Sequence, residues 1–130
     1  MSDYSDVDAA ELWQLINTYA QGGQLLEVRN YVISQEGSER VHEDQFWPMD
    51  REGSHIGGWW PSQHEVGALI SEGLLEPGEW EEKVKPERAT RKYTLTPTGR
   101  DLAALDENQV LVFFAKKGIR EHERGQARWA

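Results

Sequence analysis

The sequence predicts one domain of the α+β class, mainly helical, with a small antiparallel hairpin. Three observations predict it: an amphipathic helix over residues 8–21, a capped helix over 62–72, and a charged hairpin after it that runs into a proline-started helix. At 130 residues, with 38% apolar and 28% charged residues, the chain is long enough to bury a core. We expect the domain to span residues 1–115, followed by a basic, polar tail over 116–130.

The first helix is predicted by its cap and its apolar face. Asp8 is a good N-cap, and Gly22-Gly23 follows the last periodic position. The apolar residues recur at positions i, i+3, i+4 and i+7: Leu12, Leu15, Ile16 and Tyr19.

The next two segments are harder to assign. Residues 24–35 place Leu25, Val28 and Val32 at helical spacing, so we favour a helix, although "EVRNYVIS" has the composition of a strand. Residues 36–61 have no sustained period and are rich in Gly, Ser and Asp, so we expect a long Trp-rich insertion. One helical turn is expected near "HEDQFW", residues 42–47.

The strongest local signals lie in residues 62–75. Ser62 and Glu65 have the spacing of a capping box, and Gly73 stands where a left-handed residue ends a helix. Leu74 then begins a strand, and "KPERAT" has the composition of a hairpin tip. The partner strand is "RKYTLT", in which Thr96 caps a helix that starts at Pro97.

The last apolar run, "QVLVFFAKK" over residues 109–117, fits either a helix or a strand. Together with the preceding helix it offers an apolar surface through which a homodimer could form.

This order of elements resembles the C-terminal half of a winged helix-turn-helix domain. The resemblance covers roughly residues 62–106 and depends on the helix before "GLL", the charged hairpin and the "YTLTPTG" junction. It implies that residues 62–72 are the recognition helix and that residues 83–92 are the wing, part of an antiparallel sheet of two or three strands. The family's second helix would then be residues 24–35 or lie near 42–47, because the segment 36–61 separates the parts that the family joins by a tight turn.

The resemblance implies a transcriptional regulator that binds double-stranded DNA. A cytoplasmic location is expected separately, because the sequence has no Cys, no apolar run of membrane length and no charged-then-apolar order typical of a secretory signal. Side chains on the recognition helix would contact bases, and wing cations would contact phosphates. The base-contacting residues would be Gln63, His64 and Ser71. The phosphate-contacting residues would be Lys83, Lys85, Arg88, Arg91 and Lys92. Glu65 and Glu72 lie on the same helix and would oppose the approach of DNA.

The charge distribution leaves an alternative function open. Residues 1–82 carry 3 basic and 17 acidic residues, whereas residues 83–130 carry 11 basic and 6 acidic residues. An acidic body is also found in phage-type inhibitors, which bind a nucleic-acid-handling protein in place of its substrate. A protein-interaction surface of this kind would use carboxylates around aromatic anchors. Its residues would be Glu43, Asp44, Phe46, Trp47, Trp59 and Trp60.

Other classes of function find little support in the sequence. It contains no phosphate-binding glycine loop, nucleophile elbow or metal-site histidine spacing, so we expect a non-enzyme without cofactor or metal. The absence of Cys excludes disulfides and thiolate catalysis. No apolar run approaches the roughly 18 residues of a membrane span, so no membrane partner is expected.

Overall fold

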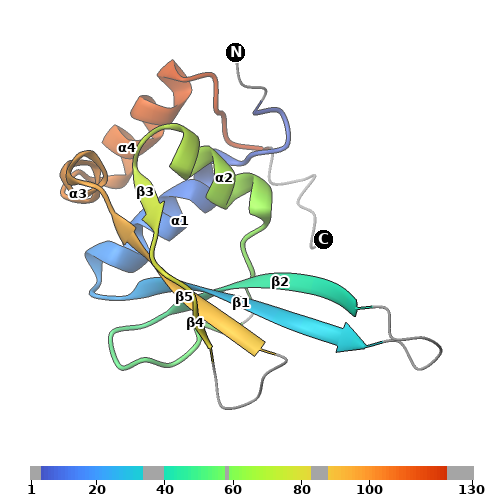
Figure 1. Ribbon diagram of the computed structural model, residues 1–130. Helices are drawn as coiled ribbons and strands as arrows, with labels where there is room; N and C mark the ends of the chain where they lie inside the picture. Colours follow the sequence, from blue (N-terminus) through green and yellow to red (C-terminus); the bar gives the residue numbers. More distant parts are fainter. Residues whose placement is uncertain (1–3, 34–39, 58, 83–87, 123–130) are drawn as a thin grey trace.

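The computed structural model describes residues 4–33, 40–57, 59–82 and 88–122, and the fold is of the α+β class as predicted. The helices are α1 (Ala9–Ala20), α2 (Gln63–Ser71), α3 (Pro97–Ala103) and α4 (Glu107–Lys116). The strands are β1 (Gln24–Ile33), β2 (Arg40–Met49), β3 (Leu75–Pro77), β4 (Glu81–Glu82) and β5 (Arg88–Leu95). The helices gather on one side, and the β1–β2 and β4–β5 hairpins extend away from them (Figure 1).

The strands form one antiparallel sheet in the order β2-β1-β5-β3. Strands β3 and β4 follow one another along the same edge of β5: β3 pairs with residues 93–95 and β4 with residues 89–90. The five described strands therefore form a sheet four strands wide, so the expectation of a two- or three-stranded wing alone is wrong.

Two predictions for the segment between α1 and α2 are wrong. Residues 24–33 form β1 rather than a helix, and residues 40–49 form β2, so residues 42–47 contain no helical turn. Both placements of the family's second helix fail with them. The described residues contain no helix between α1 and α2. The long insertion is thus partly a sheet strand, which pairs with β1 from Gln24↔Met49 to Ile33↔Arg40.

The predicted helix starts are confirmed by their caps. Asp8 accepts a hydrogen bond from the Ala10 N–H, and Ser62 and Glu65 form the reciprocal capping box of α2. Thr96 caps α3 by accepting from the Gly99 N–H at 3.0 Å, with a proline at the first helical position.

Three helices end in the same left-handed glycine turn. Gly22, Gly73 and Gly118 have φ of 90°, 74° and 85° and follow α1, α2 and α4. At Gly73 the next N–H, that of Leu74, reaches back to the Leu69 carbonyl at 2.9 Å, as in a Schellman motif. This turn points the chain from α2 directly into β3.

The hairpin returns to the helices at a close backbone contact. The Thr96 N–H donates to the Leu74 carbonyl, and a Cβ on Gly99 would lie only 2.1 Å from that same oxygen. The glycine of the "LTPTG" junction is therefore required by the approach of α3 to the end of α2, because any side chain would separate them.

The core lies between the helices and one face of the sheet. It includes Leu12, Leu15 and Ile16 of α1, Val66 and Leu69 of α2, and Leu25, Phe46, Tyr93 and Leu95 of the sheet.

The last apolar segment, residues 109–117, forms most of α4 and its C-cap, so of its two possible structures the helix is the one adopted. Phe114 is fully buried, and so is Ile119, beyond the end of α4. Hydrogen bonds from the Ala9 N–H to the Arg120 carbonyl and from the His122 N–H to the Asp8 carboxylate attach the chain beyond α4 to the start of α1.

Candidate nucleic-acid interface

The exposed face of α2 carries no charged side chain. Gln63, His64, Gly67, Ile70 and Ser71 are all exposed. Three of these are the residues expected to contact bases, and the structure places them on one helix of nine residues. The Ser71 hydroxyl also lies 3.2 Å from the Tyr4 hydroxyl, so the N-terminal segment lies beside the end of this helix.

The two carboxylates of α2 and its C-cap, expected to oppose an anion, are both engaged elsewhere. Glu65 is fully buried and accepts hydrogen bonds from the Ser62 N–H and hydroxyl. Glu72 accepts a hydrogen bond from the Tyr4 hydroxyl at 2.6 Å and forms an ion pair with Lys117 at 3.6 Å. Neither carboxylate is therefore among the exposed side chains of this helix face, and within the described residues only Glu72 is paired with a cation.

The ion pair with Lys117 also places the basic end of α4 beside the end of α2. Lys116 and Arg120 flank it and are exposed. A cationic segment next to an uncharged helix face is an arrangement in which base contacts and phosphate contacts can be made together.

Arg91, expected to contact phosphate, instead belongs to a buried network. Its Nε donates to the Glu27 Oε1 at 2.7 Å, and the Tyr93 hydroxyl donates to the same oxygen at 2.7 Å. Glu27 is only 3% exposed. Burial raises the pKa of Tyr93 above its ordinary value of 10.0, and its bond to Glu27 acts in the same direction. The charge of Arg91 is therefore balanced inside the protein.

Trp80 covers this network from the connection before β4. Its ring centroid lies 4.1 Å from the guanidinium carbon of Arg29 and 4.5 Å from that of Arg91. Such contacts between a guanidinium and an indole face are attractive. Sequence reasoning missed this contact, which attaches the base of the hairpin to β1 and β5.

The remaining wing cations are only partly described. Lys92 is exposed, and it alternates with the core-facing Arg91 and Tyr93, so it projects from the sheet face opposite the helices. Lys83 and Lys85 lie outside the described residues, as does the side chain of Arg88.

Among the described side chains of the alternative interaction surface, Trp47 and Trp60 come near one another through His55, whereas Phe46 and Trp59 pack toward the core. Phe46 is in the core at 7% exposed, and Trp59 is half-buried and donates to Glu11 at 3.2 Å. Trp47 contacts His55, which in turn contacts Trp60, with ring centroids 5.5 and 5.2 Å apart. The side chains of Glu43 and Asp44 lie outside the described residues.

Comparisons with known proteins add nothing to this geometry: no protein family, curated protein or solved structure matches the chain. Within the described residues, no three His, Asp or Glu side chains gather as a metal would require. In the same part of the chain, none of the helices has the length and apolar character needed to cross a membrane.

Proposed function

We propose that the protein binds double-stranded DNA through α2 and the β4–β5 hairpin, in the manner of a winged-helix domain, and acts in transcriptional control. The observation that carries the proposal is the exposed, uncharged face of α2. Of the two neighbouring carboxylates, Glu65 is buried and Glu72 is bound by Tyr4 and Lys117.

The dimensions of α2 support this. An α-helix with its side chains is about 10–12 Å across, which fits the width of about 12 Å of the DNA major groove. The amide of Gln63 can pair with an adenine edge, and His64 and Ser71 can donate to or accept from base edges. The absence of cations on α2 means that phosphates must be held by neighbouring elements.

Those elements are the basic end of α4 and the hairpin. Lys116 and Arg120 are exposed on either side of Lys117, which is itself paired with Glu72 at the end of α2, and the β4–β5 hairpin extends away from the helices (Figure 1). Arg91 is excluded from the phosphate-contacting set because Glu27 holds it.

The salt dependence of binding to a random-sequence duplex tests the hairpin's part. Changing Lys83, Lys85, Arg88 and Lys92 to Ala makes the plot of log K against log salt less steep, by about 0.9 in slope for each phosphate that the variant no longer neutralises. Arg51→Ala, an exposed arginine in the loop after β2, is the control and leaves the slope unchanged. A slope that is the same in all three proteins refutes hairpin binding.

Selection from a random duplex library tests α2. The wild-type protein recovers a consensus, and the combined Gln63→Ala, His64→Ala and Ser71→Ala variant loses about 1–3 kcal/mol of discrimination for each base pair read. Recovery of the same consensus by the variant contradicts base reading by α2.

One observation favours the second candidate function, an interaction module for another protein. Trp60 is 57% exposed and contacts His55, which in turn contacts Trp47, so it has the exposure of an aromatic interface anchor. A nuclease-treated pull-down should retain a stoichiometric protein that Trp60→Ala loses and that Val112→Ala, at another exposed apolar residue, retains. Recovery of the tagged protein alone, with no stoichiometric partner, rejects this function.

A further inference from the structure

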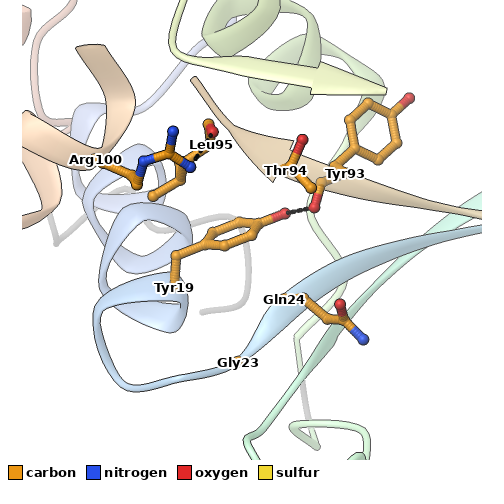
Figure 2. Close-up of a pocket in the computed structure, with 7 residues that line it drawn as sticks. All are labelled: Tyr19, Gly23, Gln24, Tyr93, Thr94, Leu95 and Arg100. Carbon is orange, nitrogen blue, oxygen red and sulfur yellow. Dashed lines mark hydrogen bonds between the residues drawn. The ribbon is translucent and has the colours of Figure 1, made fainter. Parts of the chain in front are cut away.

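A cleft of about 310 Å³ lies where the end of α1, the start of β1, the end of β5 and α3 meet (Figure 2). We propose that this cleft binds a small carboxylate with an apolar body and that Arg100 is its counter-ion. The inference is independent of the proposed function, because it uses neither α2 nor the tip of the hairpin.

The cleft exists because β5 is longer than its partner at this end. The last pair between the two strands is Leu25↔Tyr93, so the residues at 94 and 95 have no partner on β1. Two side chains occupy the space that a longer β1 would fill. Tyr19 donates to the Tyr93 carbonyl at 2.7 Å, and Arg100 donates to the Leu95 carbonyl at 3.3 Å.

The Tyr19 hydroxyl is fully used by the protein. It also accepts from the Leu25 N–H at 3.0 Å and so bridges the two strands at their last pair. Burial raises the pKa of Tyr19 above its ordinary value of 10.0, so the phenol brings no negative charge to the cleft. Tyr19 therefore offers a neutral ring as one wall.

The charge of the cleft favours an anion. Arg100 is exposed and is the single charged residue among the described residues that line it. A guanidinium has five N–H donors, and the bond to Leu95 uses one of them. Since the whole chain has a net charge of −9, an anion that binds here needs this local cation.

The size and the lining favour a carboxylate with an apolar body. Small-molecule sites begin at about 300 Å³, so the ligand must be small. The Tyr19 ring and the Leu95 side chain supply apolar surface, and Thr94 adds a hydroxyl. A single planar guanidinium matches the two oxygens of a carboxylate, whereas phosphate sites usually combine several donors.

Benzoate and benzamide test the assignment, because they have nearly the same shape and differ in charge. In amide NMR spectra, benzoate should shift the signals of residues 19, 23, 94 and 100 in a saturable manner, and benzamide should not. Inorganic phosphate at matched ionic strength should shift them less. Equal shifts with benzamide or phosphate, or no shifts with benzoate, overturn the assignment.

Variants of Arg100 localise the effect. Arg100→Gln should weaken benzoate binding by about tenfold or more, as expected for removal of a charged hydrogen-bond donor. Arg100→Lys keeps the charge but not the planar donor pair and should bind with intermediate affinity. Arg51→Gln, which removes an exposed arginine outside the cleft, should bind as wild type. Unchanged binding by folded Arg100→Gln places the ligand elsewhere and overturns the proposal.

Discussion

Replacing Arg91 by Ala tests the most consequential reassignment that the structure makes, from phosphate contact to buried partner of Glu27. The substitution removes the 2.7 Å ion pair and leaves Glu27, which is 3% exposed, with the Tyr93 hydroxyl as a donor to the same carboxylate oxygen. It also removes the contact between Arg91 and the Trp80 ring. We therefore expect a loss of folding stability rather than a specific loss of DNA binding.

The size of the destabilisation follows from the burial of the pair. Removing one partner of a fully buried ion pair costs about 3–5 kcal/mol. Because the Arg91 side chain keeps 23% of its exposure, water screens part of the effect, and we expect about 2–4 kcal/mol. A chain of this length loses about 3–4 °C in Tm for each kcal/mol, so the variant should melt about 7–15 °C lower.

Urea unfolding followed by circular dichroism measures this directly. Lys92→Ala is the matched control: it removes the neighbouring, exposed cation and should change the free energy of unfolding by less than about 0.5 kcal/mol. Adding Glu27→Gln to Arg91→Ala should restore part of the stability, since no unpaired charge remains buried. Equal stability of Arg91→Ala and Lys92→Ala would refute the buried network.

Three further predictions concern stability. Tyr19→Phe leaves the Leu25 N–H and the Tyr93 carbonyl without their bridging hydroxyl and should lower the free energy of unfolding by about 1–3 kcal/mol in the same urea assay; wild-type stability would count against the bridge. The free energy of unfolding should fall as pH rises above about 10, because tyrosines in the unfolded chain lose their protons there while Tyr19 and Tyr93 keep theirs in the folded state. This fall with pH should be shallower in Tyr19→Phe than in the wild type, and the same pH dependence in both proteins would contradict it. Gly99→Ala should cost about 3 kcal/mol, because its Cβ meets the Leu74 carbonyl, and a wild-type Tm would refute the close approach.

Local chemistry made most of the helices predictable. The caps at Asp8, Ser62 and Thr96 and the glycine at 73 act within a few residues of the turns that they define, so their sequence signals are complete in themselves. The same holds for the junction from β5 into α3, whose Thr96 and Pro97 give its start.

The sheet was less predictable because its signals are non-local. On β1, Leu25, Glu27 and Arg29 share the core-facing side, and Leu26 and Val28 face the other way. Because a glutamate and an arginine occupy inward positions, the alternation of apolar and polar residues that marks a strand is absent from β1. The spacing of Leu25 and Val28 then matches the apolar face of a helix. The partner that permits Glu27 to be buried, Arg91, is 64 positions away.

The candidate site could be predicted only in part, because its exposed residues depend on local signals and its ion pairs depend on contacts between distant residues. The exposed residues of α2 follow from a helix whose cap and stripe are local, so Gln63, His64 and Ser71 lie where expected. Which carboxylates and cations are engaged depends on contacts across the fold. Lys117 with Glu72 and Arg91 with Glu27 could not be paired from sequence spacing.

The most direct test of the account is to map the DNA contact on the folded protein. Amide NMR spectra recorded with and without a short random-sequence duplex should show the largest shifts in α2, residues 63–71, in the β4–β5 hairpin near Lys92, and in the basic segment at the end of α4, residues 116–120. The signals of the buried residues Leu12 and Leu15 of α1 should shift least. Absence of shifts at low salt, or shifts confined to the face that carries Trp47 and Trp60, would contradict the proposal that α2 enters a DNA groove.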